Sequence, residues 1–76
     1  MSLYEHVLQI VRPYLGEKSE KFLERQCRIH IGMDTNKLTK EHLPALSRWV
    51  GISASLMVST EKADAMRKEI EALGSK

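Results

Sequence analysis

The first fifteen residues place apolar side chains at helical spacings of three and four. They form two adjacent rows, Leu3, Val7, Ile10 and Tyr14 in one and Tyr4, Leu8, Val11 and Leu15 in the other. Ser2 and Glu5 have the spacing of a capping box, in which each side chain satisfies a backbone amide of the other residue. We therefore expect a helix that starts at residue 3, ends near Gly16 and carries an apolar arc wide enough to contact more than one neighbour.

A second helix is predicted at about residues 18–31, ending at Gly32. Its core side chains are expected to be Phe22, Leu23, Cys27, Ile29 and Ile31. The opposite face should be exposed and stabilised by ion pairs, because charges alternate there in the order Glu17, Lys21, Glu24 and Arg28. A polar loop follows to about residue 37.

A third helix is predicted from residue 40, with Thr39 as its N-cap. Leu43, Leu46 and Val50 form its apolar stripe. Two interpretations stay open at Gly51. In one the helix continues and adds Ala54, Met57 and Val58 to the stripe, and in the other it stops and Ser53 caps a new helix.

The last helix is the clearest amphipathic segment of the chain. Ser59 or Thr60 caps it, Gly74 closes it, and its apolar residues are Ala63, Met66, Ile70 and Leu73. No segment shows the period-two alternation of a strand. The sequence thus predicts an all-α fold, a compact bundle of four short helices, or five if the third helix stops at Gly51. We expect one helical domain over residues 1–74 and a frayed tail at residues 75–76.

The composition restricts the classes of function. A chain of 76 residues builds one marginal core, so self-association, for example as a homodimer, is one route to stability. Twelve basic and ten acidic residues leave a charge of +2, which is small for binding nucleic acid through charge alone. The sequence shows neither a signal peptide nor the run of about 20 apolar residues that a membrane span requires. With a single cysteine, it predicts a cytoplasmic protein.

Cys27 and His30 are the one pair with metal-ligand spacing. Structural zinc takes four protein ligands and catalytic zinc usually three, and the other histidines lie on other predicted helices. As a nucleophile Cys27 would need a base and a cleft, and a bundle of this size leaves little room for a substrate. We therefore expect no metal, cofactor, small-molecule substrate or enzymatic activity.

Residues 46–57, with the sequence LSRWVGISASLM, resemble the helix-turn-helix consensus. Ser47, Gly51, Ile52, Ser53 and Met57 occupy its small, glycine, apolar, serine and second apolar positions. The resemblance implies a recognition helix from Ser53 onward in the major groove of DNA. In this alternative, residues 46–58 form the DNA-binding segment. The expected contacts with DNA are Arg48, Ser53, Ala54 and Ser55, and Ser59 directly after this segment.

Binding of another protein, or of a second copy of the chain, is the preferred interpretation. The predicted recognition helix displays few side chains that form bidentate contacts with bases. The wide arc of the first helix instead predicts a docking patch formed by Tyr4, Leu8, Val11 and Tyr14. Trp49 on the third helix is a further candidate interface residue. Such a module would be regulatory or an adaptor. Replacement of Val11 by Asp would leave helicity intact if the arc is a patch and abolish folding if it is core.

Overall fold

Helix α1 spans Leu3–Leu15 and begins at the predicted capping box. In the computed structural model, which describes residues 2–75, the Glu5 amide donates to Ser2 Oγ at 3.2 Å. The Ser2 amide donates in return to Glu5 Oε1 at 3.5 Å. The helix ends at Gly16, whose φ of 63° lies in the left-handed region that favours glycine. Local sequence therefore sets both ends of α1.

The second helical segment is composite. A 3₁₀ turn, η1 (Gly16–Lys18), leads into α2 (Ser19–Gln26), and a π turn, η2 (Cys27–Ile31), continues it. Gly32 ends the segment with a φ of 80°, and its amide donates to Cys27 O at 2.7 Å. The expected helix at residues 18–31 is thus helical throughout but not one regular α-helix.

The expected ion pairs along this segment do not form. Within residues 2–75, no salt bridge joins any two members of the predicted row, Glu17, Lys21, Glu24 and Arg28. Long charged side chains in water gain little from being held in one geometry, so spacing alone did not decide the pairing. The row is an exposed, solvated face.

A connector of two short turns leads to the third helix. These turns are η3 (Thr35–Lys37) and η4 (Lys40–His42), and the buried Leu38 between them packs on the core. The Thr39 amide donates to His42 Nδ1 at 3.1 Å, which satisfies a backbone group at the start of the turn. This turn continues directly into α3.

Helix α3 spans Leu43–Ala54 and passes through Gly51 without a break. Of the two interpretations, the continuous helix is therefore observed, although it ends before Met57 and Val58. A Cβ at position 51 would lie 3.2 Å from Cδ of Arg67, a residue of the last helix. Glycine here permits the close passage of two helices and does not mark a turn.

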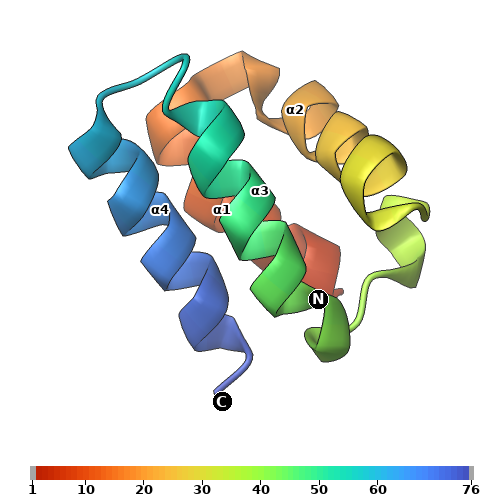
Figure 1. The fold of residues 1–76 in the computed structure, drawn as a ribbon. Helices are drawn as coiled ribbons and strands as arrows, with labels where there is room; N and C mark the ends of the chain where they lie inside the picture. Colours follow the sequence, from red (N-terminus) through yellow and green to blue (C-terminus); the bar gives the residue numbers. More distant parts are fainter. Residues whose placement is uncertain (1, 76) are drawn as a thin grey trace.

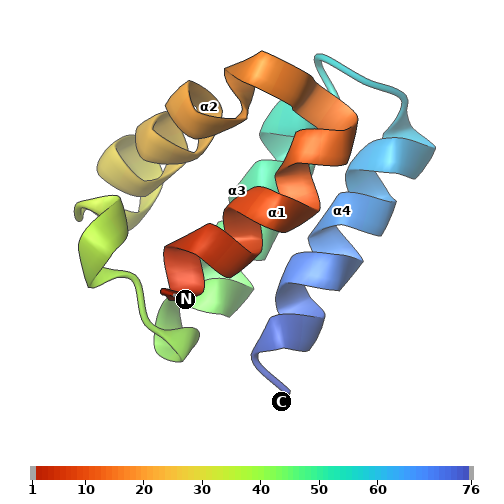
Figure 2. The same ribbon diagram turned by 180° about the vertical axis from the view of Figure 1, so that it is seen from behind.

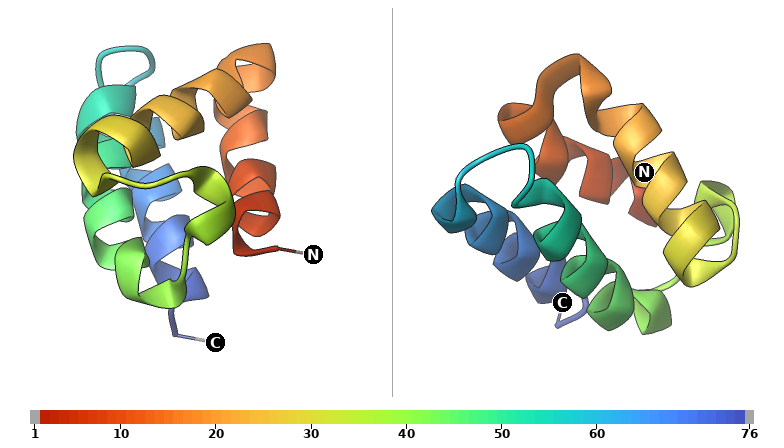
Figure 3. Two further views of the ribbon diagram at one scale, coloured as in Figure 1. Left: turned by 90° about the vertical axis from the view of Figure 1, so that its right-hand side faces the viewer. Right: turned by 45° about the horizontal axis from the view of Figure 1, so that its top comes forward.

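Helix α4 spans Thr60–Leu73 and is capped by Ser59, whose Oγ accepts from the Lys62 amide at 3.2 Å. It packs beside α3 as an antiparallel hairpin (Figure 1). Seen from behind, α1 lies in front of α3 (Figure 2), and the views in Figure 3 show α2 passing from the side of α1 to the side of α3. Helices α1 and α3 thus face each other across the core, with α2 and α4 closing its two sides.

The all-α class is confirmed, and the described residues contain no strand. The expected set of four or five short helices is met only in part, because α1, α3 and α4 are long and regular while the second segment is composite. None of the helices within residues 2–75 has both the length and the apolar character needed to cross a membrane. Ser75 is exposed beyond α4, and residue 76 of the expected tail lies outside the described residues.

One cluster of buried side chains joins all of these segments. It comprises Val7, Leu8, Val11, Phe22, Leu23, Cys27, Leu38, Leu43, Leu46, Val50, Ala54, Ala63, Met66 and Ile70. Leu8 and Val11, expected on an exposed patch, are therefore core residues, because α2 and α4 cover the arc of α1 from both sides. The opposite correction applies to Ile29, which was expected in the core and is exposed.

We predict that Val11→Asp unfolds the protein. The side chain of Val11 is completely buried, so the new carboxylate would lie unpaired in the core and cost more than about 3 kcal/mol. Circular dichroism during urea titration measures the loss. His6→Asp is the matched control, because it places the same charge at an exposed position of α1 and should leave stability nearly unchanged. Retained helicity in Val11→Asp would contradict the buried position of α1.

Candidate functional site

The two tyrosines of α1 remain partly accessible, unlike Leu8 and Val11. Tyr4 packs against the core on the side of α2. Burial raises the pKa of its phenol above the ordinary value, and the carboxylates of Glu24 and Glu20 raise it further. Of the predicted patch, α1 therefore offers solvent only parts of two aromatic rings.

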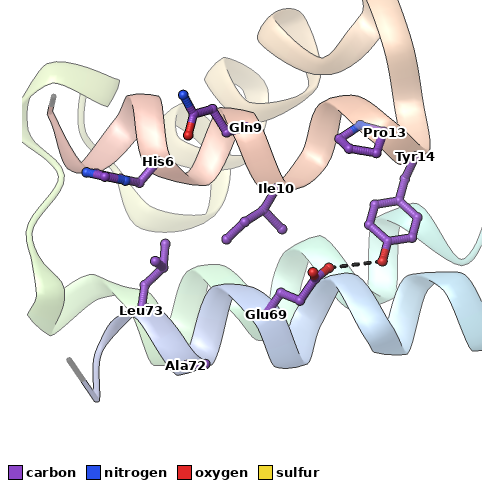
Figure 4. A pocket seen from close by; sticks show the side chains of 8 residues that line it. All are labelled: His6, Gln9, Ile10, Pro13, Tyr14, Glu69, Ala72 and Leu73. Atoms are coloured by element: carbon purple, nitrogen blue, oxygen red, sulfur yellow. Dashed lines mark hydrogen bonds between the residues drawn. The ribbon is translucent and has the colours of Figure 1, made fainter.

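Tyr14 lines a groove between α1 and α4 (Figure 4). Its hydroxyl donates to Glu69 Oε2 at 2.9 Å and so closes one end of the groove. Ile10 and Leu73 point toward each other further along it, and His6 lies at the other end. The groove has a volume of about 460 Å³, and its remaining lining residues are Gln9, Pro13 and Ala72.

The groove is a shallow depression between two packed helices. Its apolar side chains, Ile10 and Leu73, are already partly covered by contact with the core. Its polar groups at the Tyr14 end are bonded to each other. The groove therefore has little unsatisfied surface with which to hold a ligand.

We predict that the Tyr14 phenol titrates above its ordinary pKa of 10.0, chiefly because it donates to the Glu69 carboxylate. The bond favours the folded state at neutral pH, and this contribution is lost as the pH rises through the raised pKa. Ultraviolet titration in a Tyr4→Phe background isolates Tyr14. Glu69→Gln should lower its pKa, whereas Glu61→Gln on the same helix should not. An unchanged pKa in Glu69→Gln would show that the bond does not form in solution.

A second candidate site lies where α2 and η2 meet α3. The rings of His30 and Trp49 stack there, with centroids 3.9 Å apart and an angle of 7° between their planes. One turn away, the Ser53 hydroxyl donates to Gln26 Oε1 at 3.1 Å. Positions 26 and 30 thus pair with positions 53 and 49, so the two segments run antiparallel along a seam. Trp49 is a partly buried residue of this seam.

The largest exposed apolar side chains lie beside this seam and beyond its end. The exposed fractions are 59% for Ile29, 52% for Ile52, 88% for Leu56 and 47% for Met57. Ile29 precedes His30, and Ile52 precedes Ser53. Ile52 also lines a groove between α3 and α4 together with Arg48, Asp64 and Arg67, so it lies on the outer side of α3 between the seam and α4.

Helical spacing places two arginines on the same side. Arg25 lies four residues before Ile29, and Arg48 four residues before Ile52, so each pair shares one stripe of its helix. In Figure 1, α3 lies in front of α1. We name this surface the seam face and define it by Arg25, Ile29, Arg48, Trp49, Ile52 and Leu56.

The helix-turn-helix geometry does not form in residues 46–59. No turn separates two helices at Gly51, and the expected recognition helix from Ser53 is the last turn of α3 and a loop. Ser53 is bonded to Gln26 and Ala54 is buried, while the Ser55 hydroxyl donates to Ile52 O at 2.6 Å. Ser59 caps α4. Of the expected DNA contacts, only Arg48 has an exposed side chain without such a local role.

Cys27 and His30 do not converge on a common site. Cys27 is buried, and burial raises the pKa of its thiol, which disfavours the reactive thiolate. The ring of His30 stacks on Trp49 instead. Within residues 2–75, no three side chains of His, Cys, Asp or Glu are grouped as metal ligands.

Comparison with known proteins adds no relative. No family model matches the chain, and neither a curated protein nor a solved structure is significantly similar to it.

Sequence reasoning missed most of the seam face. It placed Ile29 in the core, and it considered Ile52 and Met57 only as parts of a motif or stripe. One signal was present, because residues 49–60 carry no charged side chain although α3 ends at residue 54. A charge-free run that continues past the last buried position of a helix indicates apolar residues outside the core.

We predict that His30→Ala exposes Trp49, the only tryptophan of the chain. Loss of the stacked ring opens one face of the indole to water. Tryptophan emission should therefore shift to longer wavelength, and acrylamide should quench it more strongly. His6→Ala, which changes an exposed histidine of α1 away from the seam, should leave both readouts unchanged. Equal quenching in the two variants would contradict the stacked arrangement.

Proposed function

We propose that the protein is a non-enzymatic helical module that binds another protein through the seam face, in a regulatory or adaptor role. The exposure of Ile29, Ile52 and Leu56 around Trp49 carries this proposal. A small core such as this one gains from every apolar side chain it can bury. Large aliphatic residues gathered outside it, beside a tryptophan and arginines, have the composition of an interface centre.

The chemistry of the described residues supports binding over catalysis. Cys27 is buried with a raised thiol pKa, and His30 is engaged by Trp49. A hydrolytic or transfer reaction needs an accessible nucleophile beside a free base. We place the function in the cytoplasm, where a lone free thiol stays reduced.

Of the two surfaces, the seam face is favoured over the groove between α1 and α4. The groove bonds its own polar groups and packs its apolar residues on the core. The isoleucines of the seam face have about half of their surface in water. A partner that covers them gains roughly 25 cal/mol for each Å² of apolar surface removed from water.

The test compares proteins captured from the native host by wild-type protein and by two variants. Ile52→Asp places a charge among the exposed apolar residues of the seam face, and Ala72→Asp places one in the groove at another exposed position. We expect a specific protein to be retained by wild type and Ala72→Asp and lost by Ile52→Asp. Both variants should match the wild type in urea denaturation, because both sites are accessible.

Loss with Ala72→Asp alone would assign docking to the groove and contradict the seam face. Retention of the same proteins by all three baits would mean that neither surface binds them.

A further inference from the structure

We propose that the seam face binds an acidic amphipathic helix of a different protein. This inference rests on the proposed function and adds the chemistry of the partner. It is carried by the distribution of charge between the two segments that form the face, by the unpaired state of their arginines and by the register of the seam.

The seam face carries two arginines, Arg25 and Arg48, and no carboxylate among its defining residues. The carboxylates of α2, Glu20 and Glu24, act on Tyr4 of α1. Asp64 of α4 lines a groove with Arg48 and Ile52, but it pairs with Arg67 and Lys68. The seam face therefore presents positive charge to a partner, although the chain as a whole has a charge of only +2.

Within residues 2–75, these arginines have no internal counter-ion. On the described part of the chain, Arg25, Arg28 and Arg48 take part in no salt bridge. Other arginines of the chain do form salt bridges. Arg12 binds Glu20 at 2.9 Å, and Arg67 binds Asp64 at 2.8 Å. A carboxylate of a partner can thus bind an arginine of the seam face without first displacing an internal one.

The seam sets the pattern that a partner must match. Because the segments run antiparallel, Arg25 lies toward the end of the seam occupied by Ile52, and Arg48 toward the end occupied by Ile29. Positive charge therefore flanks an apolar centre on both margins. A helix lying along the seam fits if it carries one apolar stripe with Asp or Glu on both sides of it.

The same charges disfavour a second copy of the chain as the occupant. A two-fold interface brings the same patch of both copies together. Arg25 and Arg48 of one copy would then meet arginines and no carboxylate of the face opposite. Like charges in an interface oppose association, so the geometry favours a partner of opposite charge.

The test titrates the protein with three designed peptides that lack tryptophan and follows the emission of Trp49. All three have leucine at helical spacings of three and four. Their flanking positions carry Glu in the first, Gln in the second and Lys in the third. A fourth peptide has the composition of the first in scrambled order, and vesicles of phosphatidylserine test binding to an anionic membrane.

We expect the Glu peptide to bind about fourfold more tightly than the Gln peptide, because two exposed charge pairs each contribute about twofold. Its affinity should fall as salt is added. Ile52→Asp should abolish binding. Arg25→Gln and Arg48→Gln should each weaken binding of the Glu peptide and leave the Gln peptide unaffected, while Lys62→Gln on α4 should change neither.

Equal affinities for the Glu and Gln peptides would overturn the proposal, as would equal binding of the scrambled peptide. Binding to vesicles without binding to the Glu peptide would also overturn it and point to a membrane surface. Light scattering that shows a dimer disrupted by Ile52→Asp would assign the face to a second copy. In a further outcome, no peptide binds, but the capture experiment still shows that Ile52→Asp fails to retain a protein that the wild type retains. The proposal of an acidic helical partner is then wrong, and the proposed docking function stands. If both experiments are negative, both proposals fail.

Discussion

Burial of both apolar rows of α1 is the constraint on which the rest of the structure depends. A helix whose apolar arc includes Val7, Leu8 and Val11 cannot be covered by a single neighbour. Helix α2 covers one side and α4 the other, and α3 closes the core opposite. With α1 covered in this way, α3 is left with an outer face that no other segment of the described chain covers.

The seam between the composite second segment and α3 gives that outer face its character. Contacts between side chains hold it, the stack of His30 on Trp49 and the bond between Ser53 and Gln26. These contacts leave Ile29 and Ile52 on the solvent side. Because the glutamates of α2 interact with α1, Glu20 with Arg12 and both Glu20 and Glu24 with Tyr4, arginine is the charge that remains near the seam. The apolar and the basic character of the face thus arise from the same packing.

Helix boundaries followed from local chemistry, as at Ser2, Gly16, Gly32 and Ser59, where a cap or a left-handed glycine acts within one turn. The candidate site did not follow. An apolar residue at helical spacing has the same pattern in a core as on a docking surface, so periodicity could not separate Val11 from Ile52. The glycine at position 51 was equally ambiguous, since a turn and a close helix crossing both favour it.

The sequence by itself determined that the chain is all-α, where its helices begin and end apart from the end of α3, and the buried stripe of α4. These properties depend on contacts within one or two turns, which spacing encodes directly. Only the tertiary structure decided that Leu8 and Val11 are core, that α3 continues through Gly51, and that Ile29, Ile52 and Leu56 remain in water. Exposure depends on which helices lie against each other. In a bundle this small, the core can bury only some of the apolar side chains, and the packing of all the segments together decides which of them are buried.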